Sequence, residues 1–443
     1  MGLNVLHFSV GTQLETVTFP HPLRALRSRN YRLFVAGQLI SLIGTWMQIV
    51  AQAWLIYRLT GSAMLLGIAG FAAQIPVFIL APVAGVVADR RDRRRVLIVV
   101  QSSMMLIAFL LAALTLRGHI QVWQIFTLAA LLGVANAFDI PARQSFVVQM
   151  VGRENLANAI ALNSSMVNGG RLVGPAVAAI VVAVIGEGWC FLLNAVSYAA
   201  VIAALAAMRL PPAKRTAARD SAWHSVVEGF AFAWQTQPIR ALLLLLGLVS
   251  LMGMPYTVLM PIFADRILRG GPYAYGTLMS AAGLGALGGS AVLTLRRDVH
   301  GLGRWVAAAA TGFGACLVLF ALSRKLLLSA ALLVPAGFCM MVEMAASNTL
   351  IQAMVPDRLR GRVMAVYSMM FMGMAPLGAL MAGSLAGPIG APRTVAVGGL
   401  VCVTAGLTFA AHLPSLRGPA RQLLASQQMT AGAPPDETLR SEA

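Results

Sequence analysis

Charged residues are scarce in this chain of 443 residues: only 11% are Asp, Glu, Lys or Arg, against about a quarter in ordinary soluble domains. Apolar residues make up 58% of the chain. A soluble globule of this size could not bury that much apolar surface, so we expect lipid to be the solvent for most of the chain.

Acidic residues are the rarer sign, with 15 Asp and Glu against 33 Lys and Arg and a net charge of +18. In a polar chain this excess would suggest nucleic-acid binding. In an apolar chain the better explanation is a set of basic cytoplasmic loops, because Lys and Arg resist translocation across a membrane. We therefore expect the lipid bilayer, and no nucleic acid, as a partner.

Motifs for catalysis, metals and cofactors are missing. The four cysteines lie in hydrophobic runs without CxxC spacing, and the six histidines lie in loops or at chain and helix ends without pairing. No Walker sequence is present, and the GxGxxG match at 283–288 lies inside an apolar run, where helix packing explains it. We expect no cofactor, no metal and no direct use of ATP, and a membrane enzyme is the least supported class.

Apolar runs long enough to cross a bilayer, about 20 residues each, occur twelve times. Their approximate limits are 33–57, 63–87, 96–116, 121–141, 156–184, 188–208, 239–263, 273–295, 304–323, 326–352, 362–386 and 391–412. The first thirty residues lack the apolar core of a signal peptide, so we expect the chain to start on the cytoplasmic side. Most of the 33 Lys and Arg then fall on cytoplasmic segments, which predicts that both termini are cytoplasmic.

The longest polar gap, 209–238, divides the spans into six and six. We expect an N-terminal six-helix bundle (1–208), a cytoplasmic linker (209–238), a C-terminal six-helix bundle (239–414) and a disordered cytoplasmic tail (415–443). Within the linker, apolar residues at helical spacing predict an amphipathic helix on the inner membrane surface; they are Trp223, Val226, Val227, Phe230, Ala231 and Trp234.

The two halves resemble each other. The stretch LANAIALNSSMVNGG (156–170) aligns with LRGRVMAVYSMMFMG (359–373), and each begins the fifth span of its half. Two parallel repeats of six helices predict a substrate site between the halves, near the middle of the membrane, that is exposed to each side in turn.

The stretch GVVADRRDRRR (85–95) joins the second and third spans. Its Gly85-x-x-x-Asp89-Arg90-x-x-Arg93-Arg94 pattern resembles the signature loop of the major facilitator superfamily, with Asp92 where the superfamily usually has glycine. DRRDRRR and the stretches at 30–48, 139–151 and 158–165 resemble the branch of bacterial siderophore and multidrug exporters, the enterobactin-exporter type. The resemblance covers the whole chain and implies an all-α membrane protein with twelve helices in two parallel six-helix repeats.

The same loop carries the residues of a predicted conformational latch: Gly85, Asp89, Arg90, Arg93, Arg94 and Asp139. Asp89 lies at the end of a span and could accept hydrogen bonds from a neighbouring helix N-terminus. Arg93 could pair with a carboxylate on an adjacent helix, and Asp139, at the end of the fourth span, is best placed. The alternative is that the loop determines topology alone, and both interpretations can hold.

Polar residues inside spans indicate a binding site. In the first span Gln38, Ser41, Thr45, Gln48 and Gln52 recur on one helix face, which either lines a substrate cavity or bonds to another helix. In the fifth span, Arg171 and Asn168 join the predicted cavity. A cation there costs roughly 3 kcal/mol on insertion, so Arg171 needs a partner or a function.

Two further features lie within spans. Gly170, Gly174 and Pro175 resemble the Gly-Pro motif in the fifth helix of exporters of this superfamily, and they predict either a switching helix or simple close packing. Glu343, with Ser347 one turn on, is the candidate for proton coupling, because burial favours the protonated form of a carboxyl group. A structural pair with Arg171 is the alternative.

We therefore expect a monomeric secondary transporter of the bacterial inner membrane. It would export a small amphiphilic compound, drug-like or siderophore-like, in exchange for protons by alternating access. An uptake transporter or a lipid flippase of the same fold is the alternative.

Overall fold

The computed structural model describes residues 21–152, 154–209, 222–296 and 301–430, apart from a few side chains in these ranges, among them that of Asp89. In this part of the chain the regular structure is helical, and 12 segments are long and apolar enough to cross a membrane. The prediction of an all-α protein with twelve spans is confirmed.

The first six spans are continuous helices: α1 (Arg29–Thr60), α2 (Ala63–Arg90), α3 (Arg93–Leu116), α4 (Val122–Val151), α5 (Leu156–Val184) and α6 (Glu187–Ala207). A short 3-10 helix, η1 (His21–Arg27), precedes them. Local chemistry makes the turn between α1 and α2 tight. Gly61 closes α1 in the left-handed conformation with φ of 61°, and the Ser62 side chain then accepts a bond from the backbone N–H of Leu65 to start α2.

The second six spans contain interruptions. The seventh consists of α8 (Gln237–Leu248), η2 (Val249–Gly253), α9 (Tyr256–Ile262) and η3 (Phe263–Ile267), and the eleventh of α13 (Asp357–Ser368), η4 (Met369–Gly373) and α14 (Met374–Ala386). The others are α10 (Gly271–Leu295), α11 (Leu302–Leu322), α12 (Leu326–Met354) and α15 (Ala391–Thr430). The segments η2, η3 and η4 are π turns close to Pro255, Pro261 and Pro376. Proline removes a helical hydrogen bond, and a wider turn accommodates the loss.

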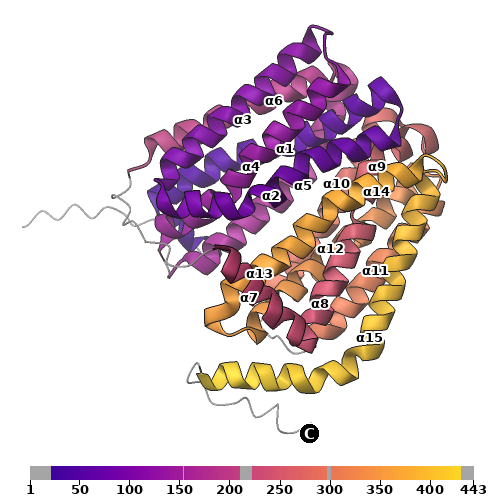
Figure 1. Cartoon of the computed structure of the whole chain (residues 1–443). Helices are drawn as coiled ribbons and strands as arrows, with labels where there is room; N and C mark the ends of the chain where they lie inside the picture. Colours follow the sequence, from indigo (N-terminus) through magenta and orange to yellow (C-terminus); the bar gives the residue numbers. More distant parts are fainter. Residues whose placement is uncertain (1–20, 153, 210–221, 297–300, 431–443) are drawn as a thin grey trace, which may run out of the picture.

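The two halves lie side by side, the first drawn from indigo to magenta and the second from rose to yellow (Figure 1). They meet along two seams, α5 against α10 and α2 against α14. Small residues allow the backbones to approach: a Cβ added at Gly67 of α2 would lie 2.6 Å from the carbonyl oxygen of Ala379 in α14.

Burial differs between the two ends of the molecule. One large apolar cluster crosses between the halves and includes the C-terminal part of α1 (Met47 to Tyr57) and the start of α2. The N-terminal part of α1, with Tyr31 and Phe34, belongs instead to a separate cluster confined to the first half. The halves therefore share a core at the end that carries the α1–α2 turn, whereas the first half packs by itself at the other end.

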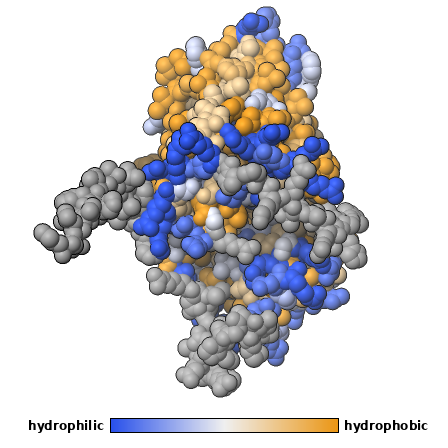
Figure 2. All heavy atoms as spheres, turned by 90° about the vertical axis from the view of Figure 1, so that its left-hand side faces the viewer, coloured by the Kyte–Doolittle hydropathy of each residue, from blue (hydrophilic) through white to orange (hydrophobic). Residues whose placement is uncertain are grey.

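The exposed surface is apolar on the flanks of the bundle. Large hydrophobic side chains such as Val99, Leu106, Ile180 and Leu327 are more than half exposed. Figure 2 looks onto the end of the molecule at the left of Figure 1, where hydrophilic residues gather below an upper flank that is largely hydrophobic. This distribution is that of a protein whose flanks contact lipid.

The linker contains one described helix, α7 (Ala222–Gln235), which packs against α13 and α8. Glu228 forms ion pairs with Arg358 and Arg362 of α13. Val227, Phe230 and Trp234 remain about half exposed on one face of the helix, so its place at the membrane surface stays a prediction. The side chains of Trp223 and Val226 lie outside the described part of the chain.

The predicted disordered tail is wrong for residues 415–430, because α15 continues to Thr430. The helix contains Pro414 and Pro419 and bends, so that its last part runs across the end of the molecule that carries α7 and α13 (Figure 1). Leu416 is buried, and Leu423 and Leu424 pack against the core. These leucines form an apolar stripe that the polar average of the segment hides. Residues 431–443 lie outside the described residues.

Candidate functional site

The loop between α2 and α3 is organised by Asp92, the residue that replaces the usual glycine. Asp92 is the N-cap of α3, and its carboxylate accepts bonds from the backbone N–H groups of Arg94 (3.0 Å) and Arg95 (3.3 Å). The side chain of Asp92 therefore satisfies two backbone donors that a helix start leaves without partners.

The latch residues of this loop contact the first half. Arg93 donates to the carbonyl oxygen of Ser145 in α4 (3.4 Å), and Arg94 donates to that of Ala206 in α6 (2.8 Å). Arg90 is exposed, and a Cβ added at Gly85 would meet nothing within 4 Å. The side chain of Asp89 lies outside the described residues. In this conformation the loop arginines hold α3, α4 and α6 together.

Arg93 and Asp139 do not pair in this conformation. Asp139 is buried and forms an ion pair with Arg143, one turn further along α4 (3.1 Å). It also accepts a bond from the Gln101 side chain of α3 (2.8 Å). An arginine four residues away on the same helix reaches the carboxylate without any rearrangement of the loop, so Asp139 belongs to the interior of the first half.

One of the two predicted roles of the polar face of α1, a bond to another helix, is seen at Gln48. Gln48 accepts a bond from the Asn194 side chain of α6 (2.6 Å) and is buried, so it bonds to another helix and does not line a cavity here. Thr45 donates to the carbonyl oxygen of Ser41 (2.9 Å). Gln38 is buried, and its Oε1 finds no hydrogen-bond partner among the described residues, whereas Gln52 is half-buried.

The glycines of α5 bring α1 close. A Cβ added at Gly170 would lie 3.2 Å from Leu42 and Trp46, and one at Gly174 would lie 2.5 Å from the Cβ of Trp46. On the other side of α5, a Cβ at Gly283 of α10 would lie 2.6 Å from the carbonyl oxygen of Arg171. Pro175 provides no N–H for that carbonyl, so α10 approaches where α5 lacks a helical hydrogen bond. This geometry supports close packing.

Arg171 lies at the same place, between the halves. Its guanidinium carbon is 5.4 Å from the centroid of the Trp46 ring, and Nη2 is 3.9 Å from the sulfur of Met340 in α12. Asn168, one turn earlier, is buried and donates to the carbonyl oxygen of Ser164 (3.0 Å). The Ser164 hydroxyl in turn lies 3.3 Å from that of Ser290 in α10.

Glu343 lies inside the second half, with 1% of its surface exposed. Its Oε1 and the Ser347 hydroxyl have no hydrogen-bond partner among the described residues. Its surroundings include Tyr367 of α13 and Cys402 of α15, both within electrostatic range. The alternative pair with Arg171 is absent from this part of the structure, because the guanidinium is directed to Trp46 and Met340.

The sequence prediction missed the contacts that join the halves at the α1–α2 end. The Tyr57 hydroxyl of α1 donates to Asp265 of η3 (2.8 Å), and Arg266 donates to the carbonyl oxygen of Gly61 (3.0 Å). Nearby, Arg58 pairs with Glu187 inside the first half (2.7 Å). Asp265 and Arg266 follow the expected limit of the seventh span, and an acid next to a base at a span end was the available signal.

The fold is that of a membrane protein with twelve spans in two halves. A family model described as a transmembrane secretion effector matches residues 21–436, and the chain belongs to that family. It lies in the siderophore and multidrug exporter branch of the major facilitator superfamily, which confirms the resemblance seen in the sequence.

Relatives of known name support this placement. The chain is 24% identical over 378 residues to the staphyloferrin A transporter of Staphylococcus aureus (strain NCTC 8325 / PS 47), covering 84% of this chain and 94% of the relative. It is 27% identical over 384 residues to the multidrug efflux pump Tap of Mycolicibacterium fortuitum, covering 84% and 93%. In structure it is similar to a POT family transporter solved with a thioalcohol-conjugated peptide (TM-score 0.71, 11% identity, covering 88% and 96%), a likeness that shows the fold alone.

Proposed function

We propose that this transporter exports a small amphiphilic compound across the bacterial inner membrane in exchange for protons. It works as a monomer by alternating access, with both termini in the cytoplasm. Efflux is the activity named for the multidrug pump Tap, one of its relatives. The excess of Lys and Arg on the loops at the end that carries α7 supports the cytoplasmic placement of that end.

The observation that supports proton coupling is the environment of the Glu343 carboxyl group, which favours its protonated form. A carboxyl group buried in a membrane span without a countercharge is far cheaper in its neutral form than in its charged form. Glu343 has that environment: it is buried, and among the described residues no cation pairs with it and its Oε1 has no hydrogen-bond partner. A change of access that brought water or a cation to this carboxyl group would release the proton, and such coupling of protonation to conformation is what an antiporter requires.

Alternating access is supported by the arrangement of the seams. The shared core and the Tyr57–Asp265 and Arg266–Gly61 bonds close the α1–α2 end, whereas the first half has its own core at the other end. Movement of the two halves about α5 and α10 would separate them at the α1–α2 end and bring them together at the opposite end. With the termini inside, this conformation is closed to the outside.

The test uses the full-length chain in vesicles with an imposed proton gradient and a panel of fluorescent pyrene derivatives, a carboxylate, an amine and a neutral amide. Proton antiport predicts accumulation of at least one derivative that a protonophore abolishes. Glu343→Gln should reduce gradient-driven accumulation at least about tenfold while it retains exchange of the derivative without a gradient. Glu154→Gln, at an exposed carboxylate in the α4–α5 connection, is the control and should behave as wild type.

Other outcomes identify the rival functions. Transport that survives collapse of the gradient would remove proton coupling. Accumulation driven in the same direction as protons would indicate uptake. Translocation of a labelled phospholipid in the same vesicles, without transport of the pyrene derivatives, would indicate a flippase.

A further inference from the structure

Arg171 carries a charge for which the described residues provide no countercharge in this conformation. It lies in the fifth span, half-buried, and no carboxylate lies within ion-pair distance of it among the described residues. Two other arginines in span helices have carboxylate partners, Arg143 with Asp139 and Arg58 with Glu187. A cation in a span costs roughly 3 kcal/mol on insertion, so the structure retains an unfavourable group here.

The two contacts of Arg171 satisfy it only in part. A cation over a Trp face gains about 0.5–2 kcal/mol, and a thioether sulfur is a weak acceptor. Trp46 and Met340 are these two partners. A guanidinium group has five N–H donors, and the described residues leave most of those of Arg171 without an acceptor.

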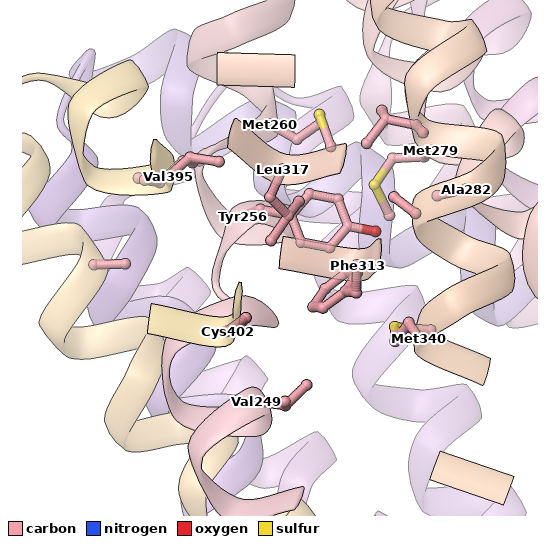
Figure 3. Close-up of a cluster of buried hydrophobic side chains, with 14 of the residues drawn as sticks. Val249, Tyr256, Met260, Met279, Ala282, Phe313, Leu317, Met340, Val395 and Cys402 are labelled. Atoms are coloured by element: carbon pink, nitrogen blue, oxygen red, sulfur yellow. The ribbon is translucent and has the colours of Figure 1, made fainter. Parts of the chain in front are cut away.

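A second donor without a partner lies nearby. Tyr256 of α9 is buried, packs edge to face on Phe313, and its hydroxyl has no hydrogen-bond partner among the described residues. It lies within electrostatic range of Arg171. Figure 3 shows its hydroxyl directed toward the helix that carries Met279 and Ala282, and the next residue of that helix, Gly283, touches the backbone of Arg171.

We propose that Arg171 and Tyr256 form an anion-binding subsite for a carboxylate of the transported compound. The guanidinium group would bind the carboxylate through two parallel hydrogen bonds, and the Tyr256 hydroxyl would donate to the same group. The Trp46 ring, which lies beside the guanidinium group, would contact the apolar body of the compound. The substrate class is thus an amphiphilic organic anion. This inference rests on the proposed transport function.

The subsite also spans both halves. Trp46 and Arg171 come from the first half, and Tyr256 and Met340 from the second. A bound anion would therefore bridge the halves, and its affinity would differ between conformations that hold these residues together or apart. Such a difference is what allows a substrate to drive a change of conformation.

The test measures equilibrium binding of pyrenebutanoate and pyrenebutylamine to the full-length protein in a neutral detergent, read by energy transfer from tryptophan to pyrene. The wild type should bind the carboxylate at least about tenfold more tightly than the amine. Arg171→Gln should lose this preference, whereas Arg171→Lys should keep its sign. Tyr256→Phe, which retains the packed ring, should weaken carboxylate binding several-fold. The matched control is Arg240→Gln, since Arg240 also lies over a tryptophan, 5.8 Å from the ring of Trp234, but on α8.

The proposal is overturned if the wild type binds neither probe, binds both equally or prefers the amine. It is also overturned if Arg171→Gln, eluting as a monodisperse protein, keeps the wild-type preference. If that variant does not fold, unchanged carboxylate binding by Tyr256→Phe together with a reversed preference in Arg171→Lys overturns it. No proton gradient is present in this binding measurement. A failure of proton coupling in the transport test therefore does not change the carboxylate preference in binding, and a failure of that preference does not change the outcome of the transport test.

Discussion

Gly174 is a residue whose identity is dictated by its neighbour. The space for its side chain is occupied by the Cβ of Trp46 at 2.5 Å and the carbonyl oxygen of Ile43 at 2.9 Å. Both atoms belong to α1, close to its backbone, and neither can move without shifting that helix. Gly169, on the same helix, has no atom within 4 Å of an added Cβ. Comparing alanine substitutions at Gly174 and Gly169 therefore separates the effect of packing from the effect of helix propensity.

We predict that Gly174→Ala lowers the thermal midpoint of the purified protein, corresponding to a loss of about 1–3 kcal/mol from overpacking. Gly169→Ala should leave the midpoint unchanged or raise it, because alanine gains about 1 kcal/mol over glycine in a helix interior. Thermal denaturation followed by tryptophan fluorescence distinguishes them. Equal midpoints for the two variants would mean that α1 and α5 are not held together at Gly174.

Individual residues also show where prediction from the sequence stops. The polarity and spacing of Gln38, Thr45 and Gln48 identified a buried face of α1, but only the packing of α6 decided that Gln48 bonds to Asn194. The sequence placed Asp139 at the end of the fourth span, and the structure shows that it is buried. The loop arginines were the only partners considered from the sequence, whereas Arg143, four residues away on the same helix, forms the ion pair.

At the scale of the element, α3 illustrates how a loop and a helix share one residue. Asp92 caps the helix through two backbone bonds and lies 3.7 Å from the exposed Arg95 side chain. An exposed ion pair of this kind contributes little. The cap should therefore account for the effect of Asp92 on stability.

We predict that Asp92→Ala weakens the first turn of α3 by about 1 kcal/mol, which corresponds to about fivefold faster hydrogen exchange at the backbone N–H groups of Arg94 and Arg95. Asp92→Gly, the residue usual in the superfamily, should cost only a few tenths of that energy. Arg95→Ala removes the ion pair, keeps the cap and serves as the control. Faster exchange in Arg95→Ala than in Asp92→Ala would assign the stabilisation to the ion pair.

The last helix shows the limit of composition at this scale. Residues 415–430 are polar on average and contain Pro419, which predicted disorder, yet α15 continues through them. Three leucines on one stripe of the helix pack against the large apolar cluster. Helical stability comes mostly from packing an amphipathic face, and composition alone does not report whether a surface for that face exists.

At the scale of the whole molecule, the closed end is held by polar contacts as well as by the shared core. The Tyr57–Asp265 bond joins the halves, whereas the Arg58–Glu187 pair lies within one half at the same end. A hydrogen bond to a charged group contributes about 1.5–3 kcal/mol. Loss of the first contact should favour opening, and loss of the second should not.

We predict that Asp265→Asn increases the opening of this end about tenfold. The measurement is the rate at which a membrane-impermeant thiol reagent labels a cysteine at Ala63, which is 9% exposed at the start of α2, in a chain whose native cysteines are replaced by alanine. Glu187→Gln is the matched control and should label at the unmodified rate. Faster labelling in both variants would reflect local loosening, and no change in Asp265→Asn would show that the apolar core alone closes this end.

The sequence by itself determined the number of spans, the division into two halves and the family. These depend on the length and hydrophobicity of apolar runs and on short motifs, which are local properties of the sequence. Only the tertiary structure decided which polar groups meet: that Gln48 bonds to Asn194 inside the first half and that Asp139 pairs within its own helix. It also placed Arg171 beside Trp46 and Met340, and left the Tyr256 hydroxyl without a partner among the described residues. Such pairings depend on the approach of helices distant in sequence. Glycine contacts of a few ångströms set that approach, and the sequence pattern does not encode which helix lies opposite.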